Sequence, residues 1–290
     1  TFVTGTVWLK SNVELYLSHG AVLKASENLA DYNEPDVYEQ NFSYPPEEWV
    51  GKHLILAVEV ENTFITGTGT IDGSAAAYYD FENRIDHSDY VWSDGLSLSK
   101  DKVNLRPGQL ICFVECSNVG VRDICVRNAT CWCCFFHGCT YVQVRGVRIF
   151  NDSSAANTDG IDLDCCRFAT VSDCIIETGD DAVAIRCSGK TLKKAPPVCE
   201  HITISNCVFS SASSAFRIGV GTGSIRHIRI SNITLYRAGV GLHFMPTIHG
   251  SGCIAIEDVN FSNVSAVNVC YPMLIGGEAG SVKDVTLDSI

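Results

Sequence analysis

The fold of this chain is decided by the stretch Val119-Gly120-Val121-Arg122-Asp123-Ile124-Cys125-Val126. Its apolar side chains alternate with other residues on either side of a two-residue polar break. Because successive side chains of a strand point to opposite faces, each half of the stretch predicts a short strand with one buried face. The polar break must then turn the chain between the two strands.

The same pattern recurs along most of the sequence. The second apolar position of each copy advances by 23 to 33 residues, a spacing typical of the coils of a solenoid. Stacked coils pair each strand with its equivalents above and below, so we expect parallel sheets along a solenoid axis. The second apolar residues of the copies are Val121, Val144, Val171, Ile204, Ile230, Ile256 and Leu287.

The residue just before the third apolar position indicates a bend in every coil. Six of the seven residues there are Gly, Asn or Asp, which tolerate a left-handed backbone or bond locally to it. With the usual hand of parallel crossovers, the prediction is an all-β fold, a right-handed parallel β-helix. The seven residues are Asp123, Gly146, Asp173, Asn206, Asn232, Asp258 and Ser289.

A second inward column precedes the first in each coil and keeps the same spacing. We therefore interpret residues 1–290 as one β-helix domain. Because Ile290 falls inside an unfinished coil, and Thr1 is no initiator methionine, we expect the domain to be truncated at both ends. The first members of the second column are Ile111, Cys134, Ile161, Val183, Phe216 and Leu242.

The composition indicates which classes of binding partner the chain is expected to lack. The 21 Lys and Arg against 33 Asp and Glu give a net charge of −12 without a basic block, so we expect no nucleic acid partner. No apolar run approaches the roughly 18 residues of a membrane span, and we expect no membrane partner either. The oligomeric state stays open.

Fifteen cysteines are an odd and high number, and they form no paired zinc pattern. Buried free thiols are the simpler interpretation, for example at Cys174 and Cys207, which share one inward column. That interpretation favours a cytoplasmic location, whereas a trimmed signal peptide would be compatible with secretion. We expect neither a metal site nor a cofactor.

Three irregular segments, residues 33–49, 81–107 and 189–197, are predicted to be loops on one flank of the solenoid. The first two are rich in aromatic residues, which suit either a sugar-binding wall or a simple hydrophobic cover. These aromatic residues include Tyr38, Tyr44, Trp49, Tyr90 and Trp92.

Acidic residues gather on two neighbouring coils. Asp159 and Asp181 each stand two residues before the first inward residue of a strand, so they should be stacked neighbours roughly 4.8 Å apart. Asp180 points to another side of the same groove, and Asp162 projects outward from the strand that follows Asp159. Like charges this close destabilise each other, a cost that structural surfaces usually avoid. The cluster indicates a catalytic site or, alternatively, a solvated acidic edge or a cation site.

Two segments that contain these acids resemble a known family. Asn157-Thr158-Asp159-Gly160-Ile161-Asp162 and Gly179-Asp180-Asp181-Ala182-Val183-Ala184-Ile185 are similar to the paired signatures of the polygalacturonase-type glycoside hydrolases, family 28. The resemblance covers nearly the whole chain, including Arg106-Pro107 and Tyr271-Pro272. It implies a right-handed parallel β-helix that hydrolyses glycosidic bonds in pectic or related plant oligo- or polysaccharides.

The resemblance also implies roles for three residues. Asp180 would protonate the glycosidic oxygen as general acid, while Asp159 and Asp181 would hold and deprotonate the water. Inversion needs carboxyl groups roughly 6.5 to 9.5 Å apart so that a water fits opposite the leaving group. Two stacked acids with a third on the far side are compatible with that arrangement, so we expect an inverting hydrolase.

The sequence departs from the family where cations usually bind the substrate carboxylate. Ser214 takes the place of the His in Gly-His-Gly, and Gly241-Leu242-His243 replaces Arg-Ile-Lys. Arg217 and His243 point outward on the next two coils and are expected to form a replacement anion or hydroxyl site. Alternatively, Arg217 is only a surface salt bridge. The substrate is thus expected to be less anionic than polygalacturonate.

Four further residues are expected to contact the substrate. Arg186 stands where the family usually has Lys, and Asp162 directly follows the first motif. Trp132 precedes Asp159 by 27 residues and so lies beside it, either stacked on a sugar or packed in the core. His137 lies on the same coil as Trp132.

Two other functions would also suit a β-helix with an acidic groove. A β-helical polysaccharide lyase would need a Ca²⁺ site and a basic residue that abstracts a proton. A non-catalytic β-helix would only bind glycans. The large loops favour cleavage from chain ends, but the sequence alone identifies neither the sugar nor the mode of attack.

Overall fold

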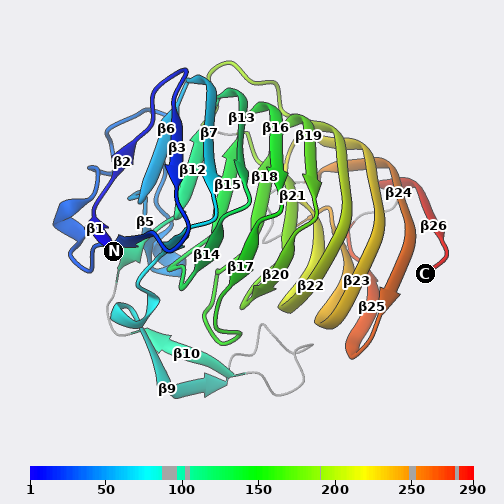
Figure 1. Cartoon of the computed structure of the whole chain (residues 1–290). Helices are drawn as coiled ribbons and strands as arrows, with labels where there is room; N and C mark the ends of the chain where they lie inside the picture. The colour runs from blue at the N-terminus through cyan, green and yellow to red at the C-terminus, as the bar shows by residue number, and fades with distance from the viewer. Residues whose placement is uncertain (87–96, 102–104, 190, 248–252, 278–280) are drawn as a thin grey trace.

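The computed structural model describes residues 1–86, 97–101, 105–189, 191–247, 253–277 and 281–290. Successive coils stack from the blue N-terminal end to the red C-terminal end in Figure 1, and parallel strands pair along the stack. The all-β, right-handed parallel β-helix that the repeat predicts is therefore the fold of this chain. No helix among the described residues is long and apolar enough to span a membrane.

Three rows of parallel strands run along the axis, and we name the row that carries the acids the site row. Two long strands, β22 (Val198–Gly221) and β23 (Ser224–Met245), bend through all three rows. The site row also contains β2 (Val7–Trp8), β6 (Ile55–Val58), β12 (Ile111–Val114), β15 (Cys134–His137), β18 (Ile161–Asp164), β21 (Val183–Cys187) and β25 (Val269–Ile275).

The other two rows close the coil. The second row contains β3 (Glu14–Leu17), β7 (Glu61–Gly67), β13 (Ser117–Arg122), β16 (Thr140–Arg145), β19 (Arg167–Ser172), β24 (Ala255–Ala266) and β26 (Val282–Asp288). The third contains β1 (Phe2–Thr4), β4 (Val22–Ala25), β8 (Thr70–Asp72), β14 (Cys125–Arg127), β17 (Arg148–Phe150) and β20 (Ile175–Thr178).

Short elements outside the rows belong to the loops. The antiparallel pair β9 (Tyr79–Asp86) and β10 (Ser97–Asp101) projects from the solenoid at the bottom of Figure 1. The parallel pair is β5 (Trp49–Val50) with β11 (Arg106–Pro107). Three 3₁₀ turns cover Leu29–Asp31, Pro45–Glu47 and Ala75–Ala77.

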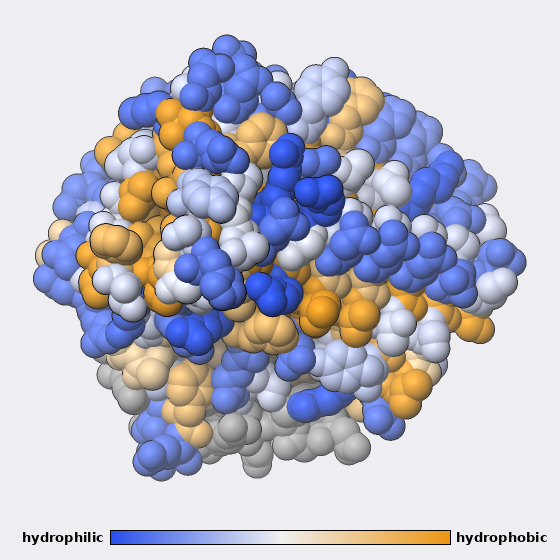
Figure 2. Space-filling view, viewed as in Figure 1, coloured by the Kyte–Doolittle hydropathy of each residue, from blue (hydrophilic) through white to orange (hydrophobic). Residues whose placement is uncertain are grey.

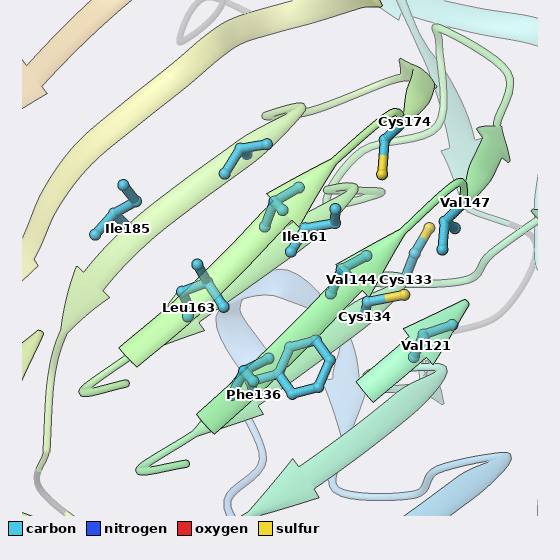
Figure 3. Close-up of a cluster of buried hydrophobic side chains, with 14 of the residues drawn as sticks. Val121, Cys133, Cys134, Phe136, Val144, Val147, Ile161, Leu163, Cys174 and Ile185 are labelled. Atoms are coloured by element: carbon cyan, nitrogen blue, oxygen red, sulfur yellow. The ribbon is translucent and has the colours of Figure 1, made fainter. Parts of the chain in front are cut away.

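The interior is built from the two inward columns that the alternation predicts. Cys134 of β15 pairs in register with Ile161 of β18, which in turn pairs with Val183 of β21. Figure 3 shows such side chains stacked inside the coil, and they are fully buried. Phe113 and Phe136 stack nearly parallel with ring centroids 5.2 Å apart. Burial of these ladders removes apolar surface from water, and this stabilises the solenoid.

The predicted bends are confirmed as left-handed corners. Six of the seven residues lie at this corner with positive φ, between 55° at Asn232 and 64° at Gly146, whereas Asp258, with φ of 52°, lies level with His227 at another corner. A second corner, which the pattern did not predict, lies just before the first apolar position of each coil. Its residues include Tyr141, Phe168, His201 and His227, which also have positive φ.

One copy of the repeat was assigned to the wrong register. The spacing predicted that Ile256 aligns with Ile230, but the structure pairs Ile230 with Phe261 and places Ile256 beside Ile225. The apolar pattern around Ile256 repeats after five residues, so both registers bury apolar side chains. In the correct register the fourth apolar position falls on Ala266, which pairs with Leu235. Because alanine is small, this register is difficult to recognise in the sequence.

The cysteines are mostly core residues, as interpreted: twelve of the fifteen thiols are buried. Cys139, Cys166 and Cys199 occupy one column, and each thiol donates to a backbone carbonyl oxygen at 3.2 to 3.4 Å. A thiol fits this column because it is small, apolar and able to bond to the preceding coil.

The outer surface of the coils mixes hydrophilic and hydrophobic side chains, as Figure 2 shows for the face seen in Figure 1. The second corner carries an outer stack of rings. Tyr141, Phe168, His201 and His227 follow one another with centroid distances between 4.9 and 5.4 Å. His201 and His227 are thus parts of a surface ladder away from the acids.

Candidate active site

The acidic cluster lies at the entrance to the site row, where two turns are stacked. Gly160 donates its N–H to the Asp181 carbonyl oxygen at 2.8 Å, so the turn containing Asp159 lies directly against the turn containing Asp181. Gly179 brings the turns together because a Cβ there would come within 2.1 Å of the Ala155 carbonyl oxygen. The predicted stacking of Asp159 and Asp181 is what the structure has.

One oxygen each of Asp159, Asp180 and Asp181 lies within 4.8 Å of the others. Asp159 and Asp181 are fully buried, whereas Asp180 keeps 6% of its surface exposed. The 4.8 Å limit applies to one oxygen of each acid, whereas the roughly 6.5 to 9.5 Å typical of inverting glycosidases is the separation of the carboxyl groups. The structure brings together the three acids that the sequence singled out.

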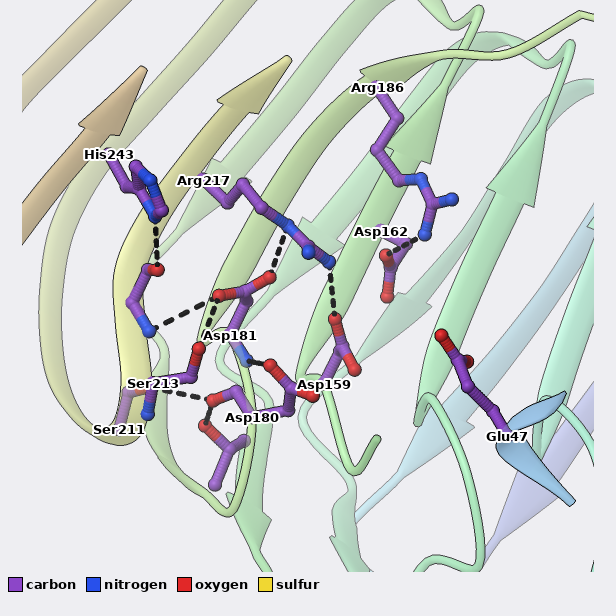
Figure 4. A network of polar contacts seen from close by, with 12 residues as sticks. Glu47, Asp159, Asp162, Asp180, Asp181, Arg186, Ser211, Ser213, Arg217 and His243 are labelled. Carbon is purple, nitrogen blue, oxygen red and sulfur yellow. Dashed lines mark hydrogen bonds and ion pairs between the residues drawn. The ribbon is translucent and has the colours of Figure 1, made fainter. Parts of the chain in front are cut away.

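Asp181 is the most heavily bonded of the three acids. Its Oδ1 accepts hydrogen bonds from the Ser213 hydroxyl at 3.3 Å and from the Ser214 N–H at 3.2 Å. Its Oδ2 lies 2.5 Å from Nε of Arg217, as Figure 4 shows. The sequence analysis did not single out Ser213. Its neighbour Ser214 stands two residues before an inward Phe, just as Asp159 and Asp181 stand two residues before inward residues, so the repeat does place this segment beside the acids.

Asp159 has fewer partners. Its Oδ2 lies 3.4 Å from Nη2 of Arg217, and its buried Oδ1 has no hydrogen-bond partner among the described residues. Burial first, and then the neighbouring carboxylates of Asp180, Asp162 and Asp181, raise the pKa of Asp159 well above its ordinary value. Burial and the neighbouring acids thus favour the protonated form of Asp159, an effect that the guanidinium of Arg217 opposes.

Asp162 and Arg186 form a buried pair on neighbouring strands. Nη1 of Arg186 lies 3.7 Å from Oδ1 of Asp162, and the Asp162 carboxylate has no hydrogen-bond donor among the described residues. Burial raises the pKa of Asp162 to about 7, although Arg186 opposes the shift. The guanidinium of Arg186 also lies over the Trp132 ring, 4.3 Å from its centroid.

The structure places Trp132 and His137 in the wall of the site, largely covered by other side chains. Trp132 is 5% exposed and contacts the ring of Trp49. His137 is 2% exposed and hydrogen-bonds through Nε2 to the Thr191 hydroxyl at 3.1 Å. Aromatic packing, one of the two alternatives for Trp132, is what the structure has, and contact with substrate stays a prediction for both residues.

His137 also faces Asp164, an acid outside the three-residue cluster. Nδ1 of His137 lies 3.6 Å from the Asp164 carboxylate, which accepts hydrogen bonds from Ser188. Burial alone would raise the pKa of Asp164, but His137, Arg186 and Ser188 together hold it below its ordinary value. This part of the wall is therefore held by contacts within the protein.

His243 lies one coil beyond Arg217, with which it pairs in register. Its Nδ1 is 3.1 Å from the Ser214 hydroxyl oxygen, so the histidine contacts the residue that bonds to Asp181. Burial first, and then the charge of Arg217, lower the pKa of His243 to about 4. The imidazole is therefore neutral near pH 7 and suits a hydroxyl better than an anion.

The loop of residues 33–49 covers the site row beside Trp132. Trp49 is 1% exposed, and Phe42 packs edge-on against both Trp49 and Phe135. These aromatic residues therefore form a hydrophobic cover, whereas Tyr44 is exposed. Tyr90 and Trp92, which were also considered for a sugar-binding wall, lie outside the described residues.

Glu47 and Arg106 are neighbours of the site that the sequence analysis did not single out. Glu47 points its carboxylate toward the acids in Figure 4 and accepts a hydrogen bond from the Trp49 indole at 3.0 Å. Arg106 donates to Oδ1 of Asn157 at 2.7 Å and so braces the turn that carries Asp159. Their positions depend on loop folding, for which the repeat carries no signal.

The spacing of Asp159, Asp180 and Asp181 would also suit a cation. In this chain, however, the guanidinium of Arg217 already supplies positive charge to Asp159 and Asp181. The arrangement resembles a proton-transfer site more closely than an all-oxygen metal cage. Asp159 and Asp181 share Arg217 as counter-ion, and Asp180 is more exposed than either.

Comparison with known proteins agrees with the resemblance seen in the motifs. The chain is 26% identical to an exo-poly-α-D-galacturonosidase of Dickeya chrysanthemi, over 83% of this chain and 44% of that protein. It is 25% identical to an endo-polygalacturonase of Pectobacterium carotovorum, over 94% of this chain and 64% of that protein. The chain spans about half the length of the first curated relatives that it matches.

Solved structures share the fold. A family 28 exopolygalacturonase of Yersinia enterocolitica superposes with a TM-score of 0.67 at 20% identity, covering 99% of this chain and 58% of that chain. The polygalacturonase of Erwinia carotovora gives the same TM-score and identity, covering 99% and 82%. The model of the family "Glycosyl hydrolases family 28" matches residues 38–286. This chain belongs to glycosyl hydrolase family 28.

Proposed function

We propose that this chain is the catalytic β-helix of an inverting glycoside hydrolase that cleaves pectic or related plant oligo- or polysaccharides. The observation that carries the proposal is the convergence of Asp159, Asp180 and Asp181 on two stacked turns of a family 28 chain. Hydrolysis needs one proton donor to the leaving group and one acceptor for the proton of water, and paired carboxyl groups supply both.

Asp180 is the proposed general acid because it is the most exposed of the three and so the best placed to meet a glycosidic oxygen. Asp159 and Asp181 are the proposed water-holding pair. Oδ1 of Asp159 is the proposed acceptor for that water, because it has neither a hydrogen bond nor an ion pair among the described residues, whereas Asp181 accepts hydrogen bonds on Oδ1 and contacts the Arg217 guanidinium through Oδ2. The water would attack the anomeric carbon, lose its proton to Asp159, and release a leaving group protonated by Asp180.

The proposed substrate is less anionic than polygalacturonate. Arg186 pairs with Asp162, and Arg217 pairs with Asp159 and Asp181, so these two arginines are already engaged. His243 is neutral near pH 7 because of its lowered pKa. A neutral or methyl-esterified sugar unit would bind here without a free cation, although relatives are named for polygalacturonate.

Cleavage from chain ends is the proposed mode of attack. Two loops meet over the site row on one side of the acids: Phe42 of the first contacts the His137 ring, and Thr191 of the second bonds to it. Backbone N–H groups of Lys193, Lys194 and Ala195 anchor the second loop on Glu115. A groove covered on one side would admit a chain end more readily than a chain interior.

The proposed hydrolase activity is tested on a panel of substrates. Purified protein is incubated with polygalacturonate, methyl-esterified homogalacturonan, rhamnogalacturonan and neutral galactan oligosaccharides, and new reducing ends are measured. Hydrolysis should appear on at least one esterified or neutral substrate, and Asp180→Asn should lower it by about 10²–10⁴-fold. Asp173→Asn, at an exposed corner, is the matched control. Products with an unsaturated end, or full activity of Asp180→Asn, would contradict the proposal.

A further inference from the structure

We propose that Arg217 is an internal counter-ion that positions Asp159 and Asp181, rather than a ligand for a substrate carboxylate. The inference rests on the proposed function only in taking these two acids as the water-holding pair. Its first support is that one guanidinium contacts both acids, Nε with Asp181 at 2.5 Å and Nη2 with Asp159 at 3.4 Å.

The strand register explains how a single arginine reaches two coils. Arg217 pairs with Ala184 of β21, which pairs with Asp162 of β18, so the three side chains stand in one outward row. Because Ala184 is small and fully buried, the Arg217 side chain has room to extend back across β21. Figure 4 shows the guanidinium between Asp181 and Asp159, facing away from His243.

The charges around Arg217 favour an internal role. Its side chain is only 16% exposed, so little of it is available to a ligand. Burial by itself would lower the pKa of Arg217, but the acids of the cluster raise it above its ordinary value, so the guanidinium stays charged. The titratable groups that face it are Asp159, Asp162, Asp180, Asp181 and His243.

In the reaction, Asp159 and Asp181 would therefore have different roles. Asp181, with two donors on Oδ1 and the guanidinium on Oδ2, is fixed in position. Asp159 shares the same guanidinium through Oδ2 and keeps Oδ1 unpartnered within the described structure. Without Arg217, two buried carboxylates would face each other uncompensated, and at least one of them would take up a proton.

The first test measures unfolding and needs no substrate. Arg217→Gln and Arg217→Lys are compared with wild type by chemical unfolding between pH 4 and pH 8. Arg229→Gln serves as control, because Arg229 pairs with Asp258 at 2.9 Å on an exposed corner of another row. A counter-ion predicts that Arg217→Gln is close to wild type at pH 4 and loses stability steadily as the pH rises. The stability of Arg217→Lys should lie between that of wild type and that of Arg217→Gln. A loss that is equal at every pH would overturn the proposal.

A double variant separates the charge pair from packing. Asp181→Asn removes the charge that Arg217 compensates, so Arg217→Gln should cost clearly less in the Asp181→Asn background than in wild type. Equal costs in both backgrounds would contradict the counter-ion role. If Arg217→Gln fails to fold even at pH 4, the same cycle is made with Arg217→Lys, which keeps the charge but shortens the reach.

The second test uses whichever glycan the wild type hydrolyses. The counter-ion role predicts that Arg217→Lys moves the acidic limb of the kcat profile to higher pH by about one to three pH units, with KM changed less than threefold. A higher KM confined to uronate substrates, with the acidic limb unmoved, would instead assign Arg217 to substrate binding and overturn the proposal. If no glycan is hydrolysed, the proposed function fails, while the unfolding test still decides the role of Arg217.

Discussion

The hydroxyl of Ser214 lies 3.1 Å from Nδ1 of His243, while the N–H of the same serine donates to Asp181 at 3.2 Å. A histidine from one coil therefore contacts the acidic cluster through a residue of the preceding coil. Members of the family usually carry a histidine at the position of Ser214. In this chain the next coil places an imidazole beside that position.

This relationship predicts a moderate effect for His243→Gln. The substitution removes a neutral hydrogen bond to Ser214, worth about 1 kcal/mol, so kcat/KM should fall by about fivefold. Because the lowered pKa of about 4 keeps the imidazole neutral, the activity ratio of variant to wild type should be constant between pH 5.5 and 8. Measured pH–rate profiles check this. A ratio that varies across pH 6 to 7 would mean that His243 titrates during the reaction.

Asp162 predicts a pH dependence of stability. Burial raises the pKa of this carboxyl from 3.8 to about 7 in the folded chain, so the folded state binds a proton that the unfolded state has released. The contribution of Asp162 is fully present below pH 3.8 and is lost as the pH rises through 7, with a slope of at most about 1.4 kcal/mol per pH unit. Unfolding of Asp162→Asn should show a flatter slope between pH 4 and 7. An unchanged slope would exclude Asp162 as its source.

The stacked phenylalanines of the interior predict a large packing effect. Phe136→Ala removes a fully buried ring that stacks on Phe113, and such truncations cost about 3–5 kcal/mol. Phe150→Ala is the matched comparison because Phe150 is 38% exposed, and it should cost less than half as much. Urea denaturation of the two variants gives both values. Equal costs would contradict the arrangement of inward and outward side chains.

The left-handed corners predict a difference between residue types at one site. Asn232 has φ of 55°, and its side chain donates to Asn206 of the preceding coil at 3.2 Å. Asn232→Val should destabilise by about 1–2 kcal/mol because a β-branched residue is strained there, whereas Asn232→Gly should cost less. Thermal unfolding of the pair checks the order. A valine variant as stable as the glycine variant would be inconsistent with the corner.

The sequence was sufficient to predict the fold because the same pattern of apolar and corner residues recurs along the chain. Alternation gave the inward columns, and Asn, Asp and Gly marked one corner of each coil. The second corner escaped notice because Tyr141, Phe168 and His201 are not residues that favour a left-handed backbone. The register error at Ile256 arose because two alignments buried apolar residues equally well, and only pairing with Ile230 distinguishes them.

For the site, local spacing predicted which acids would meet, since residues one coil apart stack directly. The partners of those acids were harder to foresee. Arg217 reaches back over Ala184 to two earlier turns, and Arg106 arrives from a loop, so neither contact follows from the repeat. Burial of Trp132 depends on the loop that carries Trp49, which has no periodic signal.

The configuration of the first product is the most direct test of the proposed mechanism. Wild-type protein is mixed with the substrate that it hydrolyses fastest, and the anomeric proton of the new reducing end is followed by NMR before mutarotation. The proposed mechanism predicts that the product forms with inverted configuration, because water held by Asp159 and Asp181 attacks opposite the bond that Asp180 protonates. A product with retained configuration, or one with an unsaturated end, would contradict it.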